Sequence, residues 1–292
     1  MHLPLQGLEP LRQGSAFVEE IRTCTPAPHQ LACWYLGQNS VVWKAQMSTV
    51  WIDPYLSTNP ARRYPPLCAP SEVNAADVVL ITHEHSDHLD PASCAGIATA
   101  SPQAIFVAPP VCGPRLQSAG VPAERIRQPR TGEEISIGPW RITPVPAAHE
   151  EVDYDPENGH HFTGYLAAIG EGVLYHAGDT VACDELVATL LPLVQRLSLA
   201  MLPINGRDYF RRKRNVLGNF TFREAAELAM RLGPALTVPL HYDLFYRRND
   251  EQPGNFVDYV YERAPYLPVA VMAPGQCLIV PLSRPACGPA VG

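Results

Sequence analysis

Three histidines and an aspartate lie within six residues of one another in the first half of the chain. The segment reads His83-Glu-His85-Ser-Asp87-His88 and follows directly on the apolar run Val78–Ile81, which predicts a buried strand. In an extended or tightly turned segment His83 and His85 point to the same side. Asp87 and His88 follow after a bend, so they face a second, neighbouring point. Imidazole and carboxylate groups suit Zn, Mn, Fe or similar divalent ions, and this geometry predicts a centre for two of them.

Further candidate ligands follow other predicted strands, each just past a strand end. They are His149 after Trp140–Val145, Asp179 after Val173–His176, and His241 after Leu236–Leu240. We therefore expect five histidines and two aspartates to converge on one rim of the molecule. The alternative, that the histidine-rich segment is only a polar surface turn, would not explain these further ligands.

Strands supply most of the elements that must position these residues. Short apolar or alternating runs separated by turn-length gaps predict strands over residues 31–36, 40–44, 49–53, 77–82, 104–108, 134–137, 140–145, 163–169, 172–176, 199–202, 235–240, 270–272 and 277–281. Helices are predicted near Ala16–Thr23, over Asp184–Leu197 with a break at Pro192, and after the capping box Thr221-x-x-Glu224. This mixture indicates an α+β or layered α/β fold rather than a simple alternating parallel sheet.

Length and composition predict one globular domain, over residues 31–292, with an N-terminal extension (1–30) packed on it. Hydrophobic residues make up 46% and charged residues 17% of the 292, which excludes a disordered chain. Acidic residues outnumber basic ones by 29 to 22, giving a net charge of −7. That charge argues against a protein that coats nucleic acid or a membrane surface.

The chain also lacks the marks of export. No apolar stretch approaches the ~18–20 residues of a membrane span, and the first residues do not form a secretory signal. Eight cysteines are scattered without a C-x-x-C pair, so they predict reduced, mostly buried thiols. We therefore expect a cytoplasmic protein.

The H-x-H-x-D-H motif and the ligands that follow it resemble those of the metallo-β-lactamase superfamily, over most of the chain from Leu31 to Leu282. The resemblance implies an αββα sandwich with the metal site at the edge between the two sheets. It also implies a partition of the ligands: His83, His85 and His149 for the first metal, Asp87, His88 and His241 for the second, and Asp179 as the bridge.

Within the superfamily, five segments resemble the L-ascorbate 6-phosphate lactonase branch. They are Trp34–Gly37, Ile52–Ser57, Gly120–Arg125, Leu174–Thr180 and Val238–Asp243. The branch implies a small phosphorylated lactone as substrate, manganese as the metal and a homo-oligomer, whereas five imidazoles also suit zinc. The expected cofactors are therefore two divalent ions, Zn or Mn.

The expected mechanism is hydrolysis. Two cations about 3.5–4 Å apart can share a bridging hydroxide while one of them polarises the scissile C=O or P=O bond. Asp87 and Asp179 are the catalytic carboxylates of this scheme, and Asp179 would set the metal spacing. Asp53, at the end of its strand, is a candidate acceptor for the free N–H of a ligand histidine, the alternative being an ordinary aspartate at a strand end.

Other residues give weaker signals for substrate binding. His160 and His161 follow in a loop after His149 and could orient the substrate, with His161 as a proton donor to the leaving group; the alternative is a pair of exposed loop histidines. Asn205 and Asp208 follow another strand end and could line the same rim, the alternative being an Asn-Gly turn.

A basic segment runs from Arg207 to Arg214 and includes Arg211. Arginine clusters bind phosphate through two parallel hydrogen bonds, so the segment predicts an anion clamp, unless it is a solvated basic surface. Interleaved aromatic side chains would also fit stacking on a base, but the acidic net charge makes nucleic acid the minor interpretation.

The sequence therefore predicts a metal-dependent hydrolase of a small anionic, phosphorylated substrate, similar to a lactonase. A phosphodiesterase is the first alternative, because the same nucleophile attacks phosphorus as well as carbon. A non-catalytic metal-binding regulatory protein is the alternative from another class. The motifs of serine hydrolases, P-loop proteins and Rossmann proteins are absent.

Overall fold

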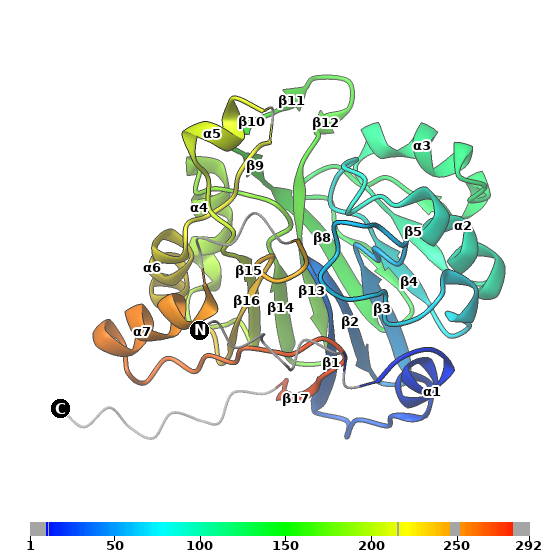
Figure 1. The fold of residues 1–292 in the computed structure, drawn as a ribbon, viewed down its shortest axis with the longest axis horizontal. Coiled ribbons are helices and arrows are strands. Elements are labelled where there is room, and N and C mark those ends of the chain that lie inside the picture. Colours follow the sequence, from blue (N-terminus) through cyan, green and yellow to red (C-terminus); the bar gives the residue numbers. More distant parts are fainter. Residues whose placement is uncertain (1–9, 11, 215, 246–251, 283–292) are drawn as a thin grey trace.

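Two mixed β-sheets lie at the centre of the computed structural model, which describes residues 10, 12–214, 216–245 and 252–282 (Figure 1). The first sheet has the strand order β17-β1-β2-β3-β4-β5-β6. Neighbours are antiparallel from β17 to β3 and parallel from β3 to β6. Its strands are β17 (Cys277–Pro281), β1 (Gln30–Gly37), β2 (Ser40–Ala45), β3 (Ser48–Ile52), β4 (Val78–Leu80), β5 (Ile105–Val107) and β6 (Ile126–Arg127).

The second sheet has the order β16-β15-β14-β13-β8-β7. Here β16, β15 and β14 are parallel, and the pairs from β14 to β7 are antiparallel. Its strands are β16 (Thr237–Leu240), β15 (Leu199–Pro203), β14 (Gly172–His176), β13 (Thr163–Ile169), β8 (Trp140–Pro146) and β7 (Ile135–Ile137). Two small ribbons pair β9 (Ala148–His149) with β10 (Glu151–Val152), and β11 (Tyr154–Asp155) with β12 (Gly159–His160).

Helices cover the outer face of each sheet (Figure 1). The first sheet carries α1 (Ser15–Thr23), α2 (Pro91–Ala100) and α3 (Gly113–Ser118), and the second carries α4 (Asp184–Leu190), α6 (Phe222–Leu232) and α7 (Pro253–Arg263). The four-residue α5 (Tyr209–Arg212) projects beside the small ribbons. Short 3₁₀ turns lie at Pro70–Glu72, Pro110–Cys112, Ala123–Arg125 and Leu191–Leu193. These four layers confirm the αββα sandwich.

The alternation of side chains along the strands builds the layers. In β1, Trp34 faces the cluster under α1 and α2, whereas its neighbours Cys33 and Tyr35 face the core between the sheets. There they meet Trp140 and Tyr165 of the second sheet. Because both faces of the sheet are buried, the strand is apolar throughout rather than alternating with polar residues. The central core therefore fixes the edge at which the two sheets meet.

Most predicted elements are confirmed, and the exceptions have local causes. The predicted helix Asp184–Leu197 ends at Leu190 and continues as a 3₁₀ turn at Pro192, and the Thr221 capping box opens α6. The predicted strand 270–272 is wrong, because these residues have no strand pairing and the only bridge nearby in the described structure is an isolated one between the preceding residue, Val269, and Thr237. The ribbons β9 to β12 have strands of two residues, too short for a periodic signal.

The cysteines and the membrane prediction can be checked within the described part of the chain. Seven cysteines there are free thiols, and Cys287 lies outside it. None of its helices combines the length and the apolar character that crossing a membrane requires.

Candidate metal centre

The carboxyl ends of parallel strands bring the candidate site together. Asp53 follows β3 and His83 follows closely on β4 in the first sheet, whereas Asp179, Asn205 and His241 follow β14, β15 and β16 in the second. Because parallel neighbours end on the same side of a sheet, each sheet presents its residues at one edge. The edge between the sheets is therefore where the functional side chains meet.

The candidate ligands form three groups, and within each group the donor atoms all lie within 4.8 Å of one another. The groups are His83, His85 and His149; His83, His88 and Asp179; and Asp87, His88 and His241. The seven predicted ligands thus lie in one connected cluster in the structure.

Two of the histidines have one ring nitrogen fixed by a hydrogen-bond acceptor. The Nδ1 of His83 lies 3.0 Å from Thr82 Oγ1, which itself donates to a carboxylate and therefore accepts from the imidazole. The Nδ1 of His149 lies 3.0 Å from the carbonyl oxygen of Gly218. With the proton held on Nδ1, the lone pair of each ring is on Nε2, the atom that faces the cluster.

Asp53 fixes a third histidine in the same way. Its carboxylate accepts a hydrogen bond from His88 Nδ1 at 2.7 Å, and it also accepts from the backbone and hydroxyl of Thr82 at 2.8 Å and 2.6 Å. All three groups are fully buried. The structure therefore places Asp53 against the outer nitrogen of a candidate ligand, which leaves His88 Nε2 as its donor atom.

The cluster fits a divalent metal by the state of its donor atoms. His83 Nε2 and His88 Nε2 are buried and have no hydrogen-bond partner among the residues that the structure describes. Leaving a buried polar atom unpaired costs about 1–3 kcal/mol, so such atoms call for a partner. Neutral imidazoles together with carboxylates form a donor set suited to Zn or Mn.

Asp179 lies at the centre of the cluster. Its Oδ1 is 3.3 Å from His241 Nε2 and 3.5 Å from His88 Nε2, and its Oδ2 is 3.6 Å from His149 Nε2. One carboxylate therefore faces the groups of both predicted metals.

The charge states of His83, His149 and Asp179 are those that a metal ligand needs. Burial lowers the pKa of His83 and His149, which keeps their imidazoles neutral. Burial alone would raise the pKa of Asp179, but the neighbouring His241 and His88 outweigh it and hold that pKa well below its usual range. Neutral imidazoles and an ionised carboxylate are the forms that bind cations.

Backbone strain also concentrates here. Asp53 has φ 44° and His241 has φ 65°, both in the left-handed region that residues other than glycine rarely adopt. Such conformations cost about 1–3 kcal/mol each and cluster at functional sites, where the surrounding structure enforces them.

Two residues of the β1–β2 turn join the cluster without having been predicted. Gln38 Nε2 donates to Asp87 Oδ2 at 2.7 Å, and Asn39 Nδ2 donates to Asp179 Oδ1 at 3.0 Å. Both residues are buried. Neither residue carries a chemical signal in the sequence, because amides in a turn between strands are common.

The two loop histidines have partners of their own. His160 is buried, and its ring nitrogens lie 2.9 Å from Thr131 Oγ1 and 2.8 Å from Glu185. The Nδ1 of His161 lies 3.0 Å from Asp153. The hydrogen bonds of His160 thus help to hold β12, whereas His161 Nε2 has no hydrogen-bond partner among the described residues.

Asn205 and Asp208 differ in their position. Asn205 is buried and lines a small cavity together with Gln38 and His241, and its Oδ1 accepts from Asn219. Asp208 caps α5 by accepting from the backbone of Phe210 at 2.8 Å. Asn205 therefore lies beside the cluster, and Asp208 serves the local turn.

The predicted basic clamp is largely engaged within the protein. Both outer nitrogens of Arg207 bond to Glu224 at 2.6 Å. Arg211 pairs with Asp208 at 2.8 Å and also bonds to backbone carbonyls. Arg212 lies 3.3 Å from Glu150. These partners compete with a substrate anion for the guanidinium groups.

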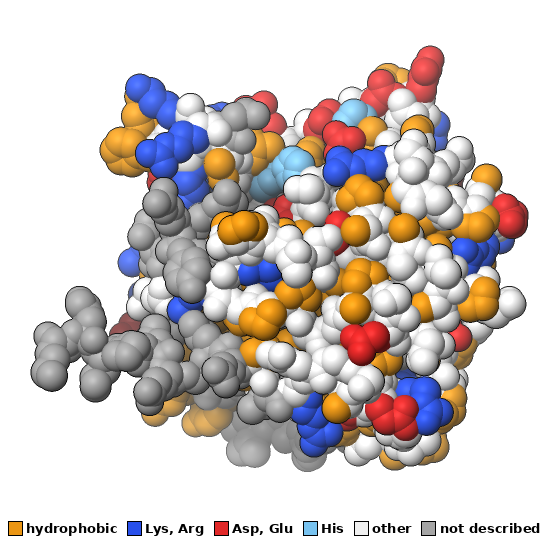
Figure 2. Space-filling model, turned by 45° about the vertical axis from the view of Figure 1, so that its right-hand side comes forward, with side chains coloured by type: hydrophobic (Ala, Val, Ile, Leu, Met, Phe, Trp, Pro, Cys, Tyr) orange, Lys and Arg blue, Asp and Glu red, His pale blue; other side chains and the backbone are white. Residues whose placement is uncertain are grey.

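A cavity of about 410 Å³ opens beside the cluster. It is lined by His149, Glu150, Glu151, Val152, Asp153, Phe162, Arg212 and Leu217. Figure 2 shows histidine side chains reaching the surface in a hollow of the molecule, near basic and hydrophobic side chains on one side and both acidic and basic ones on the other. Among the candidate metal ligands this cavity reaches His149, so a small molecule in it would lie beside the cluster.

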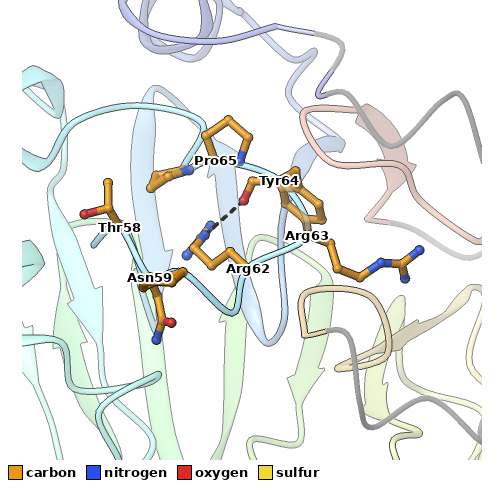
Figure 3. A pocket seen from close by; sticks show the side chains of 8 residues that line it. Thr58, Asn59, Arg62, Arg63, Tyr64 and Pro65 are labelled. Atoms are coloured by element: carbon orange, nitrogen blue, oxygen red, sulfur yellow. Dashed lines mark hydrogen bonds between the residues drawn. The ribbon is translucent and has the colours of Figure 1, made fainter.

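A second cavity, of about 440 Å³, lies on the segment after β3 and contains no predicted ligand. Figure 3 shows its lining, where Arg62 donates to the carbonyl oxygen of Tyr64. Tyr64 in turn donates through its hydroxyl to Asp243, two residues beyond His241. This segment therefore contacts the loop that carries His241, through the hydrogen bond between Tyr64 and Asp243.

Comparison with known proteins agrees with this site. Residues 48–242 match the sequence model of the family described as "Beta-lactamase superfamily domain". That range contains all seven candidate ligands.

The chain is similar to UPF0173 metal-dependent hydrolases. It is 29% identical to one from Caldivirga maquilingensis over 256 residues, covering 85% of this chain and 97% of the relative. It is 32% identical to one from Methanopyrus kandleri over 248 residues, covering 83% and 96%. Among solved structures, Igni18, a metallo hydrolase from Ignicoccus hospitalis, has a similar fold, with a TM-score of 0.65, 22% identity and coverage of 86% and 98%.

Proposed function

The chain belongs to the metallo-β-lactamase superfamily of metal-dependent hydrolases, and from this premise we propose that it is an enzyme that works with two divalent metal ions. His83, His85 and His149 would hold the first ion, and Asp87, His88 and His241 the second. The position of Asp179 is the observation that supports this proposal most directly. Its two oxygens face histidines of both groups, as a bridging ligand requires.

The bound metals would supply Lewis-acid chemistry, polarising the scissile bond and lowering the pKa of an attacking water. The protein's own residues prepare the site for this. Thr82, Asp53 and the carbonyl of Gly218 hold the Nδ1 protons of three histidines, so that each Nε2 lone pair points inward. These acceptors also fix the ring orientations before any ligand arrives.

We propose a small anionic molecule as the substrate, with a phosphorylated lactone as the first choice. Arg212 lines the cavity beside His149 and offers a guanidinium to an anion, provided that the anion displaces its contact with Glu150. His161 lies next to Phe162, another lining residue, and is a candidate for giving a proton to the leaving group. A phosphodiester is the alternative substrate of the same centre.

Turnover by the metal-loaded protein tests this proposal. The protein is stripped of metal, reloaded with Mn²⁺ or Zn²⁺, and given a phosphorylated sugar lactone or a simple phosphodiester. Lactone opening supports the first choice, and cleavage of the diester alone supports the alternative.

Asp179→Asn separates catalysis from simple metal binding. We expect this variant to lose at least about 100-fold in turnover, because one bridging charge is lost where several kcal/mol of metal chemistry depend on it. Asp184→Asn, the same change at an exposed position of α4, is the control and should keep full activity. A folded wild-type protein that binds metal but turns over neither substrate would favour a regulatory role instead.

The choice between zinc and manganese, a homo-oligomer and a cytoplasmic location stay predictions. Metal analysis of the purified protein and sedimentation velocity would test the first two.

A further inference from the structure

The β1–β2 turn places two amide side chains, those of Gln38 and Asn39, in the candidate metal cluster. Gln38 contacts Asp87, and Asn39 contacts Asp179, so each of the two predicted catalytic carboxylates has an amide beside it. Gln38 makes a second contact, because its Nε2 also lies 3.0 Å from His241 Nε2. Gln38 therefore touches two of the three residues of the second predicted metal group.

The turn is held too firmly for this contact to be accidental. Gln38 has φ 59°, and its backbone N–H donates to Asp243 at 3.2 Å, while His241 donates back to the Gln38 carbonyl at 2.7 Å. Tyr35 and Tyr64 bind the same Asp243 carboxylate through their hydroxyls at 2.7 Å and 2.8 Å. A strained, buried turn with this many contacts fixes where its side chain points.

The preceding glycine shows how close the packing is. Gly37 has φ 99°, and a Cβ at this position would lie 1.9 Å from the hydroxyl of Tyr64. Only glycine allows the tyrosine to reach Asp243 behind the turn.

An amide at this place can serve a cation as well as a carboxylate. A half-turn of the terminal amide exchanges its NH₂ group and its carbonyl oxygen while the rest of the side chain stays in place. Next to ionised Asp87 alone, the NH₂ group is favoured as a hydrogen-bond donor. Next to a divalent cation, the oxygen is favoured, because it is the negative end of the amide dipole.

We propose, building on the two-metal function above, that Gln38 belongs to the second metal subsite and presents its amide oxygen to the ion bound there. The subsite would then combine Asp87, His88 and His241 with a neutral oxygen donor. Oxygen donors favour hard ions, so Gln38 contributes more to binding of Mn²⁺ than of Zn²⁺. The first subsite, built from three histidines, lacks any such contact with Gln38 among the described residues.

Metal titration of the full chain tests this assignment. Free Mn²⁺ is followed by electron paramagnetic resonance, and Zn²⁺ by competition with a coloured chelator. In Gln38→Met, which keeps the length but removes the amide, we expect the second equivalent of Mn²⁺ to bind about tenfold or more weakly. The first equivalent should stay within twofold of wild type, and the loss for Zn²⁺ should be smaller.

A second variant distinguishes the amide oxygen from the amide NH₂ group. Gln38→Glu supplies only oxygens, so it should strengthen the second equivalent, whereas a residue needed only as a donor to Asp87 would weaken it. Gln46→Met is the matched control, because Gln46 lies in the next hairpin turn with φ 48° and is exposed. It should leave both equivalents unchanged, and thermal unfolding verifies that each variant is folded.

The outcomes separate this inference from the proposed function. The role of Gln38 alone is overturned if wild type binds two equivalents of Mn²⁺ and Gln38→Met binds the second one as tightly. It is also overturned if Gln38→Glu binds the second equivalent more weakly than wild type. A wild-type protein that binds fewer than two equivalents overturns the two-metal function, and the role of Gln38 with it.

Discussion

Replacing Asp53 by asparagine tests how the protein prepares a metal ligand. Three donors converge on the Asp53 carboxylate: His88 Nδ1 and the backbone and hydroxyl of Thr82. Asparagine has one oxygen in place of two, so its NH₂ group would face either the Thr82 backbone N–H, which binds Oδ1, or both His88 Nδ1 and the Thr82 hydroxyl, which share Oδ2. In the second orientation the imidazole must move its proton from Nδ1 to Nε2, and Nε2 then lacks the lone pair that binds metal.

The size of the effect follows from these contacts. Loss of a partner that orients a ligand histidine typically weakens metal binding about 10–100-fold, which corresponds to about 1.4–2.7 kcal/mol. Because the site is fully buried, the unsatisfied donor should also lower the free energy of unfolding by about 1–3 kcal/mol. We expect the larger loss of affinity in the equivalent that His88 binds.

Titration calorimetry with Mn²⁺ or Zn²⁺ measures the affinity, and ¹⁵N NMR of the imidazoles reports which nitrogen of His88 carries the proton. Asp77→Asn is the control. Asp77 precedes β4, at the end away from His83, and it accepts from Thr49 at 2.7 Å. It should leave the metal affinity unchanged. If Asp53→Asn folds and binds both equivalents as tightly as wild type, the orienting role of Asp53 is refuted.

Two further predictions concern stability. Thr221→Ala removes the hydroxyl that caps α6, where Thr221 accepts a hydrogen bond from the Glu224 backbone. Urea unfolding should therefore show a free energy of unfolding lower by about 0.5–2 kcal/mol. An unchanged midpoint and slope would contradict this. The metal-free protein should become less stable as the pH falls below about 6.5, because burial lowers the pKa of His83, His85, His149 and His176 in the folded state and the unfolded chain then binds more protons. For His88, burial is outweighed by Asp179 and Asp53, which raise its pKa, so this one imidazole acts in the opposite direction to the other four. Thermal unfolding in chelator between pH 7.5 and 5.5 checks this, and a melting temperature that rises on acidification would contradict it.

Local chemistry in the sequence was enough to predict the cluster and a mixed α/β fold, whereas the αββα order of the layers was predicted from the resemblance to the superfamily. The histidines of the H-x-H-x-D-H motif are close along the chain, and each remaining ligand follows a strand whose apolar composition is visible in the sequence. Strand periodicity and the capping box are also local signals, so most strands and α6 could be placed. The break at Pro192 follows from the missing N–H of proline.

Contacts between distant residues could only be decided by the tertiary structure. Gln38 meets Asp87 across 49 positions and Asn39 meets Asp179 across 140, and neither amide is distinctive in the sequence. For the basic segment Arg207–Arg214, the sequence suggested a function that the tertiary contacts do not favour. Its arginines suggested an anion clamp, but folding brings Glu224 to Arg207 across 17 positions. A ligand motif consists of residues that are close along the chain, so the sequence shows it directly. The hydrogen-bond or ion-pair partner of a side chain depends on which strands and loops the fold places next to each other.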